Sequence, residues 1–376
     1  MKEMIRYEIY KLLHKPLAWA GLAGILLFVG VMEWRWVAPG YAAIQADVNG
    51  RRENTLDFAA IKRNQEIAAR YAGPLTTETV KEILNTYLFS EEMLEESGLD
   101  PERQGHYTHN LLYDTFSQHG FTTMAGEWNG SAIEDIYGQI APDLILGYSA
   151  GWEGTLYAMV YCFLSWGCVL VILLSPLFCG EYDRHMDALI LTGCQGRRKA
   201  PLAKAAAAFI VSLGGSLLLI AVFFFVLLAS HGMVGFESSV QLGEMGLLLS
   251  TPYVLSWAQA FGFTCLLLLG AAAVLTALLL VVSALAKNSF SSLVISFVLF
   301  TAPMFIPWHK LPIILHLAGS LLPINQMQIN LLFSFDKIYL GNWGLNVMWL
   351  VLPLGLTTGL MGILWSKRAF ARHQVM

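Results

Sequence analysis

Residues 179–193 read Cys-Gly-Glu-Tyr-Asp-Arg-His-Met-Asp-Ala-Leu-Ile-Leu-Thr-Gly, a polar stretch between two long apolar runs. The acids Glu181, Asp183 and Asp187 crowd its first turns, where the positive end of a helix dipole favours negative charge. Gly193 follows the last regular position, where helices commonly stop. A lipid-embedded chain has no structural need for a charged helix in a connecting loop. We therefore expect this stretch to transmit force to a soluble partner.

The composition is that of a membrane protein. Of the 376 residues, 56% are hydrophobic and only 13% are charged, against about 25% charged residues in soluble domains. Apolar runs of about 18 residues or more indicate membrane spans. Six runs qualify: 17–37, 152–178 (apolar from 155), 201–230, 257–285, 290–307 and 347–366. The predicted fold is an all-α polytopic membrane protein with six transmembrane helices, of which the fifth is the shortest.

Lys and Arg in the short flanks set the orientation, because they accumulate on the cytoplasmic side. They cluster before 17, within 179–200, at Lys287 and after 366. The prediction is a multi-pass protein of the plasma membrane with both termini cytoplasmic. Residues 179–200 form a cytoplasmic coupling helix and basic loop, and 367–376 a cytoplasmic tail. Residues 231–256 form an outer loop, and 308–346 an outer loop or re-entrant segment with a short helix near 313–322.

The predicted extracellular segment, 38–151, differs in kind from the rest. It carries 17 acidic and 7 basic residues, a net charge of −10. Helix signals occur at 54–71, at 79–93 (with Thr79 opening a capping box) and at 110–119. We expect a mainly helical extracellular domain. None of the five cysteines lies in it, so disulfides are not expected.

Residues 1–16 are predicted to form an amphipathic elbow helix in the inner membrane interface. One apolar face is made by Ile5, Ile9, Leu12, Leu13 and Pro16. The cations Arg6, Lys11 and Lys15 would meet anionic lipid headgroups. The alternative is a basic flank that only sets topology.

Several chemistries are absent from the sequence. There is no phosphate-binding loop of the Gly-x-x-x-x-Gly-Lys-Ser/Thr type, so nucleotide hydrolysis by this chain is not expected. His106, His109 and His119 lack ligand spacing and are expected to be solvated loop histidines, so no metal site is predicted. The centres of spans two to six lack charges, which argues against an ion-coupled carrier. Energy would enter mechanically from the cytoplasmic side.

Two stretches carry a family resemblance. They are Met-Ile-Arg-Tyr-Glu-Ile-Tyr-Lys-Leu-Leu-His-Lys-Pro-Leu-Ala-Trp at 4–19, and Phe-Cys-Gly-Glu-Tyr-Asp-Arg-His-Met-Asp-Ala-Leu-Ile-Leu-Thr-Gly at 178–193 with Arg198 and Lys204 after it. The pattern resembles the permease subunits of ABC exporters of the six-span, elbow-helix class, with a large insert between spans one and two.

The resemblance implies a transport subunit that is not itself an enzyme. Residues Glu181, Arg184, Asp187 and Leu191 would contact a dimer of separate ABC ATPase subunits. Those subunits would bind ATP and Mg²⁺, and this chain would hold no cofactor. A second permease subunit, identical or homologous, would pair through spans one, two and five. For Glu181, the alternative is a role confined to the helix dipole. Membrane lipid is an expected partner and nucleic acid is not.

The substrate class follows from the apolar spans. Candidate conduit residues are Phe223, Phe261, Phe297 and Phe300, and such walls suit an amphiphilic peptide, antibiotic or lipid-like molecule. For any single Phe, a packing or lipid-facing role weighs more. Two other function classes stay open: a polytopic sensor or scaffold with a ligand-detecting ectodomain, and a membrane enzyme acting on lipid. Co-purification with an ATPase separates the exporter from both.

Overall fold

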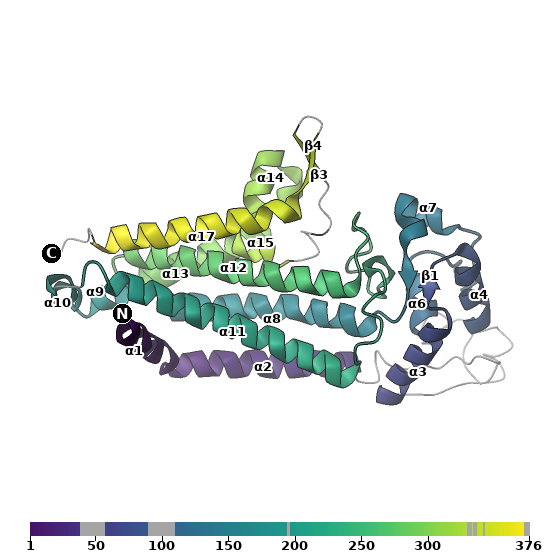
Figure 1. The fold of residues 1–376 in the computed structure, drawn as a ribbon, viewed down its shortest axis with the longest axis horizontal. Helices are drawn as coiled ribbons and strands as arrows, with labels where there is room; N and C mark the ends of the chain where they lie inside the picture. Colours follow the sequence, from purple (N-terminus) through teal and green to yellow (C-terminus); the bar gives the residue numbers. More distant parts are fainter. Residues whose placement is uncertain are drawn as a thin grey trace. The chain divides into compact units, whose positions relative to one another are not determined.

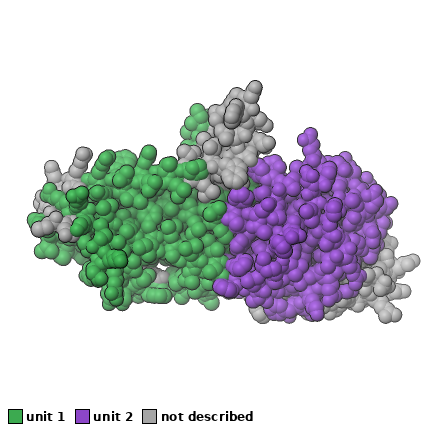
Figure 2. Space-filling view, viewed as in Figure 1, with its two compact units in different colours: residues 1–29, 159–222, 264–376 green, residues 30–158, 223–263 purple. Residues whose placement is uncertain are grey.

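The structure is a computed structural model that describes residues 1–37, 57–88, 110–193, 196–328, 333, 337–340 and 343–371. The chain is mostly helical. It divides into two compact units, coloured separately in Figure 2. Unit 1 comprises residues 1–29, 159–222 and 264–376, and unit 2 comprises 30–158 and 223–263. The acid-rich stretch 91–102, His106 and His109 lie outside the described residues.

Unit 1 is built from helices that run side by side (Figure 1). They are α1 (Lys2–Leu13), α2 (Pro16–Val37), α8 (Ala150–Leu174), α9 (Cys179–Asp183), α10 (Asp187–Thr192), α11 (Ala200–Ser230), α12 (Trp257–Leu285), α13 (Ser289–Thr301) and α17 (Val347–Ala371). The division between the units falls within α2, α8, α11 and α12.

Small residues allow α8 to pack closely against its neighbours in unit 1. A Cβ built on Gly167 would lie 2.3 Å from Phe300 of α13, and one built on Gly215 of α11 would lie 2.3 Å from Trp166. The Trp166 indole N–H also donates to Ser216 Oγ at 3.1 Å. Without a hydrophobic driving force between helices in lipid, such close approach is a main source of helix association.

Three described helical stretches are long and apolar enough to cross a membrane: Ala150–Asp183, Ala200–Ser230 and Trp257–Leu285. They correspond to predicted spans two, three and four. At predicted span five, α13 is only 13 residues long and passes into the 3-10 helix η4 (Ala302–Phe305) around Pro303. At about 1.5 Å per residue, α13 extends about 20 Å, less than a hydrocarbon core of about 30 Å.

The segment after α13 is more structured than a loop. It contains η5 (Trp308–Lys310), α14 (Ile313–Ser320) and α15 (Pro323–Gln326), so the predicted short helix is present. It also holds an antiparallel hairpin of β3 (Lys337–Leu340) and β4 (Trp343–Asn346), pairing Lys337 with Asn346. This hairpin was not expected from the sequence. Its signal was the Gly-Asn dipeptide at 341–342, a favoured hairpin connection.

Unit 2 has a core of its own. Helices α3 (Asp57–Arg70), α4 (Thr77–Tyr87), α6 (Leu111–Gln118) and α7 (Ile133–Tyr137) surround a buried cluster that includes Ile61, Ile83, Phe116 and Phe121. The 3-10 helix η2 (Gly138–Asp143) follows α7, and two short strands, β1 (Gly73–Pro74) and β2 (Ile145–Leu146), pair antiparallel.

The predicted helices of this unit are confirmed with shifted ends. The second was expected at 79–93 with Thr79 as cap, but α4 begins at Thr77. Thr76 is the cap, and its side chain accepts a hydrogen bond from the Thr79 N–H. The third prediction is close, because Asn110 caps α6 by accepting from Leu112 and Tyr113.

The segment 231–256 folds onto the first turns of α8 within unit 2. Glu153 is fully buried and accepts hydrogen bonds from the N–H groups of Met245 and Leu247 at 3.0 and 2.9 Å. The Trp152 indole donates to Val234 O. The 3-10 helix η3 (Val240–Leu242) lies in this segment. Backbone donors thus satisfy a buried carboxylate, as burial requires.

Candidate coupling site

The polar stretch after α8 is two short helices, where the sequence predicted one. Helix α9 ends at Asp183, and α10 begins at Asp187. His185 between them has φ 54°, in the left-handed region that stops a helix. The Met186 N–H bonds back to Glu181 O at 2.9 Å, which closes α9. The expected end before Gly193 is confirmed, because α10 finishes at Thr192.

The Glu181 carboxylate joins three helices of unit 1. Its Oε1 lies 2.8 Å from Lys11 Nζ of α1 and 2.8 Å from Lys204 Nζ of α11. Lys204 also lies 3.1 Å from Glu8 of α1, and Lys11 lies 3.6 Å from Glu8. The side chain of Lys204 is only 2% exposed, so this charge depends on its acid partners. Two lysines and two glutamates therefore form a balanced network.

Lys11 lies at the more exposed edge of this network, and its pKa is shifted. Burial by itself would lower the pKa of Lys11, but the hydrogen bond to Glu181 and the charge of Glu8 outweigh it and raise that pKa. Lys11 therefore stays charged. The network holds α9 against α1 and the start of α11.

Polar contacts also attach α9 to α12 and α13. Asp183 accepts from the backbone N–H of Ser289 at 2.9 Å and from its hydroxyl. The Phe178 N–H donates to Ser283 Oγ at 2.9 Å, and the Tyr182 hydroxyl donates to Ala284 O at 3.3 Å. The Tyr182 ring stacks on Phe370 of α17. Helix α9 is thus fixed to five other helices of unit 1.

Helix α10 is different, because Leu189 and Thr192 are exposed and Ile190 is only partly buried. Leu189 is 70% exposed and Met186, which precedes the helix, is 43% exposed. Arg184 is exposed at the end of α9. Asp187 begins α10 and Leu191 lies within it, and the side chains of both lie outside the described set. Exposed apolar side chains on a short polar segment are typical of an interaction surface.

The predicted elbow residues separate into two groups. Helix α1 is present and ends before Pro16, which begins α2. Arg6 is exposed, whereas Lys11 and Lys15 are partly buried, and Lys15 Nζ donates to Leu173 O at 3.2 Å. Leu12 is buried. The Glu8–Lys11–Leu12 face of α1 therefore packs on protein.

The four candidate conduit phenylalanines do not belong to one unit. Phe223 and Phe261 belong to unit 2, and Phe297 and Phe300 to unit 1. Phe223 and Phe300 are buried, and Phe297 is 47% exposed. Phe261 packs on Trp152 with ring centroids 5.8 Å apart. Each therefore has a packing role or an exposed surface, as expected for single aromatic residues in spans.

Sequence reasoning missed part of the site. Glu8 and Ser289 were not singled out, and Lys204 was noted only as a basic residue that follows the polar stretch. The signal for Glu8 was its spacing, because Glu8, Lys11 and Leu12 at i, i+3 and i+4 share one helix face. The signal for Ser289 was weaker and indirect. The residue before it, Asn288, is of a type that caps helices, and it caps α13 by accepting from the Ser291 N–H.

No protein-family model and no curated protein matches this chain. Among the residues that the structure describes, no group of three or more His, Cys, Asp or Glu side chains could hold a metal ion. The functional assignment therefore depends on the geometry of α9 and α10.

Proposed function

We propose that the chain is the membrane-spanning permease subunit of an ATP-driven exporter of the ABC type. Separate ATPase subunits bind ATP and Mg²⁺, and this chain carries no cofactor and does no chemistry itself. All six predicted spans, with α1 as an interfacial elbow and both termini cytoplasmic, belong to this proposal. The α9–α10 segment receives the movement of the ATPase.

The observation that carries the proposal is the contrast between α9 and α10. Helix α9 is fixed to the bundle through the Glu181 network and through the Asp183–Ser289 contact. Helix α10 follows after the turn at His185 and presents Leu189 outward. A partner that moves α10 would pull on α9, and α9 would move several helices together. This is the mechanical requirement for coupling through a packed element.

The transported molecule would be amphiphilic: a peptide, an antibiotic or a lipid-like compound. The three long helical stretches are rich in Phe and Leu, and an apolar tail gains about 0.8 kcal/mol per buried methylene. A hydrophilic ion would lose its hydration there without compensation. A second permease subunit, identical or homologous, would complete the pathway.

Affinity purification of the tagged chain from its native membrane in mild detergent tests this function. We expect an ABC ATPase to co-purify in a fixed ratio, and ATP hydrolysis by the complex to rise with added amphiphile. A chain that purifies without any ATPase would instead favour a sensor or scaffold. Unit 2 gives that alternative a basis, because it holds a cavity of about 400 Å³ lined by Gln65, Tyr148, Phe236 and their neighbours.

A further inference from the structure

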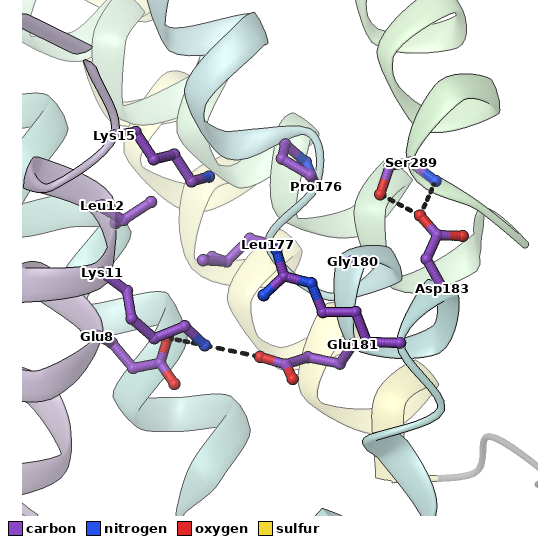
Figure 3. Close-up of a pocket in the computed structure, with 11 residues that line it drawn as sticks. Glu8, Lys11, Leu12, Lys15, Pro176, Leu177, Gly180, Glu181, Asp183 and Ser289 are labelled. Carbon is purple, nitrogen blue, oxygen red and sulfur yellow. Dashed lines mark hydrogen bonds and ion pairs between the residues drawn. The ribbon is translucent and has the colours of Figure 1, made fainter. Parts of the chain in front are cut away.

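Unit 1 contains a cavity beside the ion-pair network, drawn in Figure 3. Its volume is about 410 Å³, within the range of small-ligand sites. Lys11, Lys15 and Leu12 enter from the α1 side, whereas Asp183 and Ser289 lie on the opposite side (Figure 3). Pro176 and Leu177 give it apolar wall between these groups.

The acids that line this cavity are already engaged. Glu8 and Glu181 bind Lys11 and Lys204. Asp183 accepts from the N–H and the hydroxyl of Ser289, on the side away from Lys15. Each of these carboxylates therefore already has a lysine or a hydrogen-bond donor beside it.

Two cations in the cavity wall have no acid partner. Lys15 Nζ donates to a backbone carbonyl, that of Leu173, and no carboxylate of the described chain lies within ion-pair distance of it. Arg184 makes no ion pair or hydrogen bond with the described residues. Burial lowers the pKa of Lys15, and the charges of Lys11, Arg184 and Lys204 lower it further, although the charge of Glu8 opposes this shift. An anion between Lys15 and Arg184 would relieve this repulsion.

The charge balance indicates what kind of anion fits. The cavity and its network hold four cations and three acids, an excess of one positive charge: Lys11, Lys15, Arg184 and Lys204 against Glu8, Glu181 and Asp183. A phosphodiester carries one negative charge. The wall made by Leu12, Pro176 and Leu177 suits a glycerol backbone and the first methylenes of an acyl chain.

We propose that this cavity binds the phosphodiester of an anionic phospholipid headgroup between Lys15 and Arg184. The cavity lies where α1 turns at Pro16 into α2 and where α8 ends, the level at which headgroups meet apolar helices in the predicted topology. The proposal rests on membrane insertion as predicted, and it does not depend on an ATPase partner. A lipid bound there would lie beside the Glu181 network and stiffen the base of α9.

Native mass spectrometry of the purified chain in detergent, titrated with a phosphatidylglycerol, tests this site. We expect one tight binding event, with phosphatidylcholine binding at least about tenfold more weakly. Each of Lys15→Met and Arg184→Gln should weaken phosphatidylglycerol binding about fivefold, and the pair about thirtyfold, from one charge contact each. The control variant Arg197→Gln removes an exposed cation outside the cavity and should bind as the wild type does.

Thermal melting without added lipid checks that all variants are folded, and Lys15→Arg should restore binding if Lys15→Met is unstable. Equal affinity for the two lipids, or unchanged binding by both folded variants, would overturn the proposal. Displacement of the lipid by millimolar inorganic phosphate would assign the cavity to free phosphate and overturn the lipid assignment. These measurements use the chain alone, so their failure is distinct from failure to find an ATPase.

Discussion

Lys204 Nζ lies 2.8 Å from Glu181 Oε1, and the Lys204 side chain is only 2% exposed. Lys204 lies near the start of α11, and Glu181 belongs to the short helix α9, so the pair ties a polar connection to a long apolar helix. Glu181 therefore faces the interior of unit 1. Any role of Glu181 in coupling would be exerted through α1 and α11.

Replacement of Lys204 by Met should be strongly destabilising. It would leave Glu8 and Glu181 partly buried with only Lys11 to share, and removing one partner of a buried pair costs about 3–5 kcal/mol. Lys11→Met should cost about 1 kcal/mol or less, because that side chain is 35% exposed. Thermal unfolding of the purified variants checks this order, and equal melting temperatures for the two variants would contradict it.

Two adjacent glycines of α11 should respond oppositely to alanine. A Cβ at Gly215 would lie 2.3 Å from the Trp166 ring, so Gly215→Ala should destabilise by about 1–3 kcal/mol. A Cβ at Gly214 would meet nothing within 4 Å. Gly214→Ala should therefore be neutral or stabilising by up to about 1 kcal/mol, since Ala favours helix. If both variants melt at the same temperature, the packing of α8 on α11 is wrong.

His119 was expected to be a solvated loop histidine, but it is buried in unit 2, and its own contribution to stability should fall in acid. Burial lowers the pKa of His119 to about 4 from an ordinary value of 6.5, although its hydrogen bond to Gly243 O opposes the shift. The His119 Nε2–H donates to Gly243 O at 2.9 Å, and Nδ1 accepts from the Tyr137 hydroxyl at 2.8 Å. Between pH 6.5 and about 4, the unfolded state therefore binds one more proton at His119 than the folded state does. The stability contributed by neutral His119 is lost as the pH falls through that window.

The fall of the His119 pKa from 6.5 to about 4 corresponds to about 3 kcal/mol. His119→Gln retains a donor for Gly243 O but cannot titrate. The difference in melting temperature between wild type and His119→Gln should shrink from pH 7 to pH 4. A difference that stays constant over this range would show that His119 is not buried in its neutral form.

Impermeant thiol reagents should distinguish the two sides of the membrane. In a background without the five native cysteines, a cysteine at Met124, which is fully exposed in unit 2, should react from outside intact cells. A cysteine at the exposed Arg198 should react only after the membrane is opened. The reverse pattern would invert the predicted orientation.

The sequence predicts the long helices well, because runs of apolar residues are a composition signal that tertiary contacts do not change. It also predicts that the polar stretch is helical and that the helix ends before Gly193. It could not predict the break at His185, because nothing in the residue type requires a left-handed backbone there. The partners of Glu181 were equally hidden. Glu181 and Lys11 are 170 residues apart, and only the folded bundle brings them to 2.8 Å.

If α10 contacts a separate ATPase, the exposed Leu189 should lie in that contact. In the purified complex, Leu189→Asp should abolish amphiphile-stimulated ATP hydrolysis and reduce the recovered ATPase, because it places a charge at an apolar contact. The matched control Met124→Asp makes the same kind of change on a fully exposed residue of unit 2, on the predicted outer side, and should retain wild-type stimulation. Unaltered stimulation and ATPase recovery in folded Leu189→Asp would contradict the account.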